Sequence, residues 1–193
     1  MVAAAIAAAA VFIAEFGDKS QLLILAFATR YPALPVIAGL VVAAAFIQGV
    51  SVLVGAAVGA VLPGQLVGLA AGLAFLGVAA WTLRGEDDDP TEEAPRGGRL
   101  AGIGLAATVA ATFVIGELGD KTMLVTFGLA ATQGALATWI GSTIGEVAAN
   151  LVAVVVGRQV GSRLSPRAVR IGSAALFAVG GVVILLGVLL GGE

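Results

Sequence analysis

The chain has 193 residues, of which 60% are hydrophobic and only 11% are charged; its mean hydropathy is +1.08 and its formal net charge is -2. This composition is typical of integral membrane proteins and excludes an ordinary soluble domain, while the small net charge gives no reason to expect nucleic acid as a partner. Because the sequence has no Cys and no His, any bound metal must be held by oxygen atoms, which favours calcium, manganese or magnesium over zinc and copper.

The apolar residues fall into six runs, each near or above the roughly 20 residues that a helix needs to cross a bilayer. In chain order, the runs are about 2–29, 33–61, 66–83, 101–131, 134–157 and 169–190. Ala, Gly and Val dominate the second, third, fifth and sixth runs, as expected where helices pack closely in lipid. The sequence therefore predicts an all-α integral membrane protein with six transmembrane helices.

A polar motif of six residues occurs twice, as EFGDKS at 15–20 and ELGDKT at 117–122, with an offset of 102. The same offset pairs Gly39 with Gly141 and Phe75 with Phe177. We therefore expect two repeats of three helices, 1–83 and 101–193, joined by an acidic linker, 84–100. Because three is an odd number, the second repeat must enter the membrane from the opposite side. This is an inverted-topology repeat, as in many secondary transporters.

The basic residues outside the motifs predict the orientation, because Lys and Arg are concentrated in cytoplasmic loops. With six spans, all eight follow the first, third or fifth helix and so share one side: Arg30, Arg84, Arg96, Arg99, Arg158, Arg163, Arg167 and Arg170. We therefore expect a multi-pass protein of the cell (inner) membrane, with a cytoplasmic linker and both termini outside.

Each motif places two acids inside the bilayer, where a charge costs roughly 2.5–3.5 kcal/mol on insertion scales. The Glu and the Asp of one motif are three residues apart and therefore share a helix face. The predicted cation ligands are these four acids, Glu15, Asp18, Glu117 and Asp120. Further oxygen ligands are predicted at Ser20, Gln21, Gln48, Thr122 and Asn150.

Other motif residues are predicted to support the acids. Gly17 and Gly119 either admit a neighbouring backbone or let the helix unwind. Lys19 and Lys121 either point away from the cation or pair with a carboxylate as internal counter-ions. Four carboxylates and two lysines sum to -2, which one divalent cation or two protons would neutralise, so competition for one site would give exchange. Glu146, in the fifth run, is left open between a fifth ligand, a proton relay and a partner for a motif lysine.

A purely structural role is the alternative for the motifs, in which their ion pairs only hold the first and fourth helices together. This alternative is disfavoured, because a buried ion pair rarely improves on apolar packing.

The two E-x-G-D-K-[S/T] motifs resemble those of the GDT family of cation/proton exchangers. The eukaryotic members are Golgi manganese and calcium transporters, and the bacterial members include manganese exporters. The resemblance covers nearly the whole chain and implies that the motif acids are the cation ligands. Two positions depart from the family: Met123 stands where members often have Gln, as at Gln21, and Glu146 stands where many relatives have His. The thioether would soften the preference for hard cations. Because position 146 is not a histidine, the resemblance does not by itself give Glu146 the proton-relay role of a histidine.

The sequence thus predicts a secondary transporter that exports manganese or calcium from the cytoplasm in exchange for protons, by alternating access at the carboxylates. It predicts no enzymatic activity and no cofactor, since the cation is cargo, and it leaves a homo-oligomer possible. The alternatives are a cation channel and an exporter of small organic solutes. An intramembrane aspartyl protease using Asp18 and Asp120 is disfavoured, because such a dyad needs mutual repulsion without nearby cations, whereas each Asp here precedes a Lys.

Overall fold

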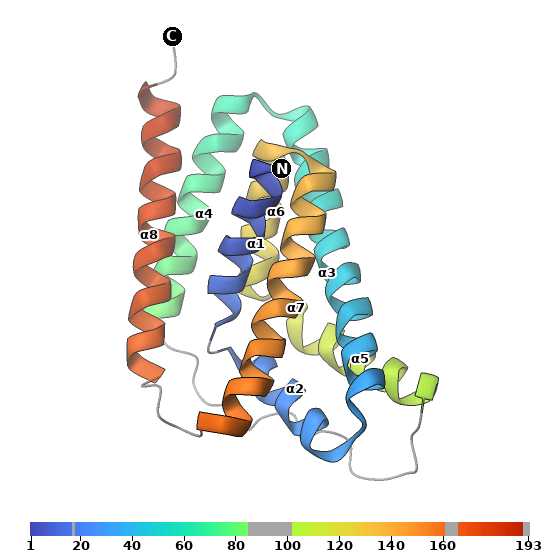
Figure 1. The fold of residues 1–193 in the computed structure, drawn as a ribbon. Coiled ribbons are helices and arrows are strands. Elements are labelled where there is room, and N and C mark those ends of the chain that lie inside the picture. The colour runs from blue at the N-terminus through green and yellow to red at the C-terminus, as the bar shows by residue number, and fades with distance from the viewer. Residues whose placement is uncertain (17, 85–101, 161–165, 191–193) are drawn as a thin grey trace.

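The protein is all-helical in a computed structural model that describes residues 1–16, 18–84, 102–160 and 166–190 (Figure 1). In this part of the chain the helices are α1 (Val2–Glu15), α2 (Lys19–Arg30), α3 (Ala33–Val61), α4 (Gly64–Arg84), α5 (Gly102–Glu117), α6 (Lys121–Gln133), α7 (Ala135–Val160) and α8 (Pro166–Leu190). The predicted acidic linker lies outside the described residues apart from Arg84, which ends α4.

Candidate membrane spans can be counted only within the described residues. There, α3 with 29 residues and α4 with 21 are each long and apolar enough to cross a membrane. The pair α5–α6 passes the same criterion jointly, as one span broken by an 80° bend or as a re-entrant loop. Two shorter apolar helices are α1 and the Phe177–Leu190 part of α8. The helices are those of a membrane protein with two or three candidate spans, fewer than the six predicted.

The predicted runs 2–29 and 101–131 are not continuous helices, which corrects the sequence prediction. Each run is interrupted within its motif, since α1 ends at Glu15 and α5 ends at Glu117. Gly119 explains the second interruption: its φ of +86° is left-handed, which glycine adopts without strain and an α-helix cannot include. A Cβ at Gly119 would meet no neighbouring atom within 4 Å, so this glycine unwinds the helix and does not admit a second backbone.

The aspartates of the two interruptions have the same backbone geometry. Asp18 has φ -82° and ψ 163°, and Asp120 has φ -74° and ψ 168°. The N–H of Asp18 donates to the carbonyl of Glu15 at 3.1 Å, and the N–H of Asp120 donates to that of Glu117 at 3.1 Å. The sequence offset of 102 therefore recurs in the local fold.

Two pairs of helices at equivalent positions of the repeat run in opposite directions (Figure 1): α3 rises and α4 descends, whereas α7 descends and α8 rises. Helix α1 descends from the upper end, and α6 rises towards it. Short turns join α2 to α3 at Tyr31-Pro32, α3 to α4 at Leu62-Pro63 and α6 to α7 at Gly134, whose φ is +98°. We call the end where α1 begins and α8 ends the upper end of the molecule.

The helix packing repeats between the halves. Helix α1 packs along α7, α3 packs along α5, and α4 packs along α8. A Cβ at Gly141 would collide with the carbonyl oxygen of Ala4, and a Cβ at Gly39 would collide with that of Ala106. These two contacts are related by the same offset of 102, and the absent side chains allow the backbones to approach closely.

The buried apolar side chains form two clusters. One cluster joins α2, α3 and α5 and includes Phe27, Leu40 and Phe113. The other joins α1, α4, α6 and α8 and includes Val11 and Phe177. In each interrupted pair, one helix belongs to each cluster: α2 and α5 to the first, and α1 and α6 to the second. The interruptions therefore lie where the two clusters meet. The polar motif residues are therefore enclosed by apolar packing on both sides.

Candidate cation site

The four motif acids come together at the junction of the two apolar clusters. One carboxylate oxygen from each of Glu15, Asp18, Glu117 and Asp120 lies within 4.8 Å of the other three. All four side chains are buried, and the most accessible of them, Asp120, is only 5% exposed. Two helices from each half thus build one cluster of four carboxylates, which we call the acid cluster.

The acid cluster has the dimensions of a cation site. Two oxygens on opposite sides of a calcium ion, each about 2.3–2.6 Å from it, are roughly 4.6–5.2 Å apart. The 4.8 Å limit on the separations between the acid oxygens falls inside that range. A smaller hard cation would draw the same oxygens slightly inward.

Each acid also keeps an oxygen free for a ligand. Within the described residues, the buried side-chain oxygens of the two motifs that lack a hydrogen-bond partner are Glu15 Oε1, Asp18 Oδ2, Glu117 Oε2, Asp120 Oδ2 and Thr122 Oγ1. Buried polar atoms are nearly always paired, so a group of unpaired acceptors requires an explanation. A shared hard cation fits the chemistry of these oxygens.

The helix ends around the acid cluster favour a cation. Helices α1 and α5 end at the first acid of each motif, and a helix C-terminus carries roughly half a negative elementary charge. Asp18 and Asp120 occupy the N-cap positions of α2 and α6, yet neither carboxylate caps its helix with a hydrogen bond. These two carboxylates therefore remain available to the cluster.

An ion pair crosses between the two halves. Lys121 Nζ of the second motif lies 3.0 Å from Asp18 Oδ1 of the first, and the two side chains are 13% and 1% exposed. Of the two arrangements predicted for this lysine, the structure shows the ion pair with a carboxylate. In the first motif, Ser20 Oγ donates a hydrogen bond of 2.8 Å to Glu15 Oε2. Gly17 and the Lys19 side chain lie outside the described part of the structure.

We expect Lys121→Met to destabilise the cation-free protein by about 3 kcal/mol, because it leaves Asp18 buried without its counter-ion. Added Mn²⁺ should then raise the unfolding temperature more than in the wild type, since a cation replaces the missing charge. Thermal unfolding in detergent with and without Mn²⁺ measures both effects. Arg30→Met, at the exposed end of α2, is the control and should change neither. Equal behaviour of the two variants would contradict the counter-ion role.

The three amide residues predicted as ligands use their NH₂ groups elsewhere. Gln21 Nε2 donates to the carbonyl of Ala149 on α7 at 3.3 Å, and Asn150 Nδ2 donates to the carbonyl of Glu146 at 3.0 Å. Gln48 Nε2 donates to the Glu146 carboxylate. The oxygens Gln48 Oε1 and Asn150 Oδ1 have no hydrogen-bond partner in the described residues. Glu146 is fully buried and is not one of the four clustered carboxylates.

Three buried hydroxyl groups were missed by the sequence analysis. Thr126 Oγ1 of α6 donates to Ser142 Oγ of α7 at 3.1 Å, and both side chains are fully buried. Thr138, one turn before Ser142, is also fully buried. The available signal was the spacing of four residues from Thr138 to Ser142 and on to Glu146, which places all three on one helix face.

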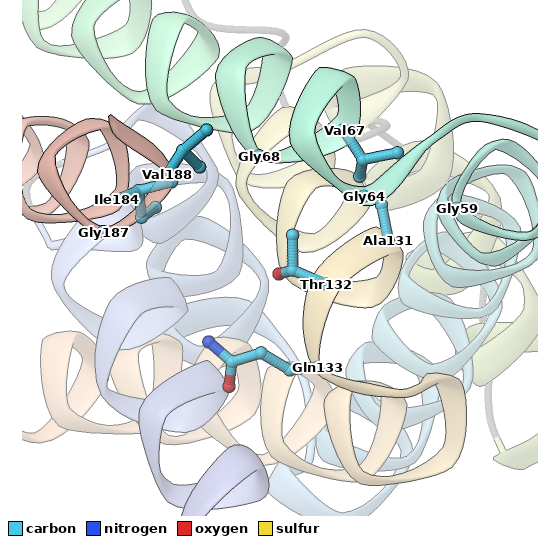
Figure 2. A pocket seen from close by; sticks show the side chains of 10 residues that line it. All are labelled: Gly59, Gly64, Val67, Gly68, Ala131, Thr132, Gln133, Ile184, Gly187 and Val188. Atoms are coloured by element: carbon cyan, nitrogen blue, oxygen red, sulfur yellow. The ribbon is translucent and has the colours of Figure 1, made fainter. Parts of the chain in front are cut away.

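A cavity of about 400 Å³ opens at the upper end of the molecule, away from the acid cluster. Figure 2 shows its lining from α3, α4, α6 and α8: Gly59, Gly64, Val67, Gly68, Ala131, Thr132, Gln133, Ile184, Gly187 and Val188. None of these residues is charged, so this cavity does not have the donor set of a cation site.

Comparisons with known proteins agree with the chemistry of the acid cluster. The family described as "Divalent cation/proton antiporter GDT1" matches residues 3–90 and 105–191. A "Putative manganese exporter" of Vibrio cholerae is 30% identical over 90% of this chain and 85% of its own length. The "GDT1-like protein sll0615" of Synechocystis is 28% identical over 89% of this chain and 90% of its own.

A chloroplast relative is longer than this chain. "Protein PAM71, chloroplastic" of Arabidopsis thaliana is 32% identical over 88% of this chain, a match that covers 52% of the relative. No solved structure matches the chain at a significant level. The two family matches cover most of the sequence, and the family consists of cation transporters and not of enzymes. The chain therefore belongs to the GDT1 family of divalent cation/proton antiporters, as its duplicated motif indicated.

Proposed function

We propose that this protein exports manganese, calcium or both from the cytoplasm in exchange for protons. The observation that carries the proposal is the acid cluster, in which two carboxylates from each half converge within 4.8 Å and each keeps an unpaired oxygen. A relative named for manganese export supports manganese as one cargo, and oxygen-only donors accept calcium equally well.

In the proposed arrangement, the chain crosses the membrane six times as two inverted repeats. The interrupted pairs α1–α2 and α5–α6 each count as one broken span, and α3, α4, α7 and α8 are the other four. The opposite directions of corresponding helices, the equivalent contacts at Gly39 and Gly141, and family matches that begin 102 residues apart support this arrangement. Non-helical backbone at membrane depth is tolerated where protein encloses it, as it does at Asp18 and Asp120.

The proposed orientation places the upper end of the molecule outside the cell and the linker in the cytoplasm. The Arg residues near helix ends at the opposite end support it, because such residues favour the cytoplasmic side: Arg30 ends α2, Arg84 ends α4, and Arg167 lies in the first turn of α8. The apolar clusters above and below the acids would then act as the two barriers that open in turn.

The same carboxylates would carry both substrates. Four acids and two lysines leave a charge of -2, which either one divalent cation or two protons would neutralise. An unneutralised charge buried in the membrane interior is costly. The site would therefore release the cation when protons replace it, and release the protons when the cation returns.

The test is transport in proteoliposomes under an imposed pH gradient, with Mn²⁺ and Ca²⁺ supplied separately. We expect uptake of at least one cation to follow the gradient and to stop when a protonophore collapses it. Cation flux that ignored the gradient would identify a channel. Absence of any flux of either cation would refute the proposed export activity.

A further inference from the structure

Helix α7 carries a row of buried polar side chains on one face. The row has a spacing of four residues and consists of Thr138, Ser142, Glu146 and Asn150, all 0% exposed. In the first half, the residues 102 positions earlier are Val36, Leu40, Ala44 and Gln48. The first three of these are apolar and buried in α3. The polar row is therefore confined to one of the two halves.

Helix α6 adds to the row from the opposite side. Thr126 Oγ1 donates to Ser142 Oγ at 3.1 Å, whereas the equivalent residue of the first half is the buried Ile24. Around Thr126, the neighbouring core residues of α6 are Val125 and Leu129, which belong to an apolar cluster. The hydroxyls thus cross a region that is otherwise packed with apolar side chains.

The row leads from the upper end of the molecule towards the acid cluster. Helix α7 begins at the upper end, beneath an exposed α6–α7 turn, and Thr138 is the first buried residue of the helix (Figure 1). Four residues of helix rise roughly 6 Å, so Glu146 lies roughly 12 Å further in than Thr138. Within the described residues, the charged groups with which Glu146 interacts electrostatically are the cluster acids Glu15, Glu117 and Asp120, and its neighbour on α3 is the neutral Gln48.

The chemistry of the row suits protons and not divalent cations. A hydroxyl both donates and accepts a hydrogen bond, so it can pass a proton along a chain. Side chains four residues apart on a helix have Cβ atoms roughly 5–6 Å apart, and one water with two hydrogen bonds spans roughly 5.5 Å, so the spacing of the row suits single bridging waters. Thr138 Oγ1 and Glu146 Oε1 have no partner in the described residues and are free to complete such bridges. Three neutral hydroxyls supply too few oxygens, and no charge, to replace the hydration of a divalent cation.

We propose that Thr138, Ser142 and Thr126 form a path that carries protons between the upper end of the molecule and the acid cluster, separate from the route of the cation. This inference rests on the proposed exchange of cations for protons. The three hydroxyls then pass protons and do not hold the cation. The path also explains why they occur in only one half, since the two barriers need not both conduct protons.

The test compares Thr138→Val with Thr138→Ser in proteoliposomes. The valine variant keeps the volume and breaks no hydrogen bond of the described structure, so it should fold normally. We expect its proton flux, measured with a pH dye during Mn²⁺ exchange, to fall at least tenfold, while Mn²⁺ affinity in detergent stays unchanged. The serine variant, which retains a hydroxyl, should restore the flux.

Ser142→Ala combined with Thr126→Val provides a second test, with Thr132→Val as the matched control on the same helix. Thr132 bonds only to carbonyls of its own helix, so its loss should leave the flux unchanged. Wild-type flux in Thr138→Val and in the double variant would overturn the path, as would a parallel loss of Mn²⁺ affinity. If the wild-type protein itself showed no coupling to protons, the proposed exchange would fail together with the path. Proton coupling in the wild type with unchanged flux in the variants would overturn the path alone.

Discussion

Replacing Glu15 with Gln is expected to reduce cation transport at least about a hundredfold. Removing one carboxylate charge from around a buried cation costs about 3–5 kcal/mol, and each 1.4 kcal/mol corresponds to a factor of ten. Glutamine keeps the shape of the side chain and an oxygen that accepts the hydrogen bond from Ser20, so the local structure should persist. Glu117→Gln should have a similar effect, because the two acids occupy equivalent positions. The measurement is the initial rate of Mn²⁺ and Ca²⁺ uptake in proteoliposomes.

Thermal unfolding distinguishes this loss of function from misfolding. In the absence of a cation, four clustered acids repel one another, so the removal of one charge should leave the unfolding temperature unchanged or raise it. Mn²⁺ should stabilise Glu15→Gln much less than the wild type. Glu92→Gln makes the same chemical change in the acidic segment between the halves and should transport normally. Transport within threefold of wild type in both Glu15→Gln and Glu117→Gln would show that the acid cluster does not hold the cargo.

Gly141→Val is expected to prevent normal folding or to destabilise the protein by at least about 1–3 kcal/mol, the usual cost of overpacking. The first added carbon would collide with the carbonyl oxygen of Ala4, and backbone atoms cannot move aside as a flexible side chain can. The damage would separate α1 from α7 and so displace Glu15 at the end of α1. The yield of monodisperse protein in detergent and its unfolding temperature measure the effect.

The matched control is Gly77→Ala on α4, where an added carbon meets no atom within 4 Å. This change should be neutral or slightly stabilising, because alanine favours a helix over glycine by about 1 kcal/mol. Gly39→Val, at the equivalent contact with Ala106, should be as damaging as Gly141→Val. A Gly141→Val protein as stable as Gly77→Ala would contradict the close packing of α1 against α7.

Much of the helical arrangement could be predicted from hydrophobicity and from the repeat. The run at 33–61 coincides with α3, and the runs near α4, α7 and α8 differ from those helices by a few residues. The interruptions at Asp18 and Asp120 were harder to foresee, because the apolar residues continue on both sides of each motif and a glycine within a helix does not always break it. The left-handed conformation of Gly119 depends on the fold around it.

The acids of the candidate site were evident from sequence, because charge inside an apolar run is costly and therefore conspicuous. The partners of the neutral groups were not evident. Gln48 and Asn150 could have been directed at the acids. Instead, the NH₂ group of Gln48 bonds to the Glu146 carboxylate, which depends on how α3 and α7 face each other, and that of Asn150 bonds to the Glu146 carbonyl of its own helix. Likewise, a threonine or a serine in a membrane helix commonly bonds to its own backbone, as Thr132 does, so residue type alone did not distinguish Thr126 and Ser142.

The paired contacts of Gly39 with Ala106 and of Gly141 with Ala4 have a consequence for how such a protein can arise. Each half supplies one glycine and one alanine carbonyl to these contacts, so the two halves use the same surface to bind each other. A gene encoding one half alone would yield a subunit able to form a two-fold symmetric, antiparallel dimer with its twin, provided that it inserted into the bilayer in both directions. Fusion of two such genes would fix one copy in each direction and leave each free to diverge, as the hydroxyls confined to α6 and α7 have done.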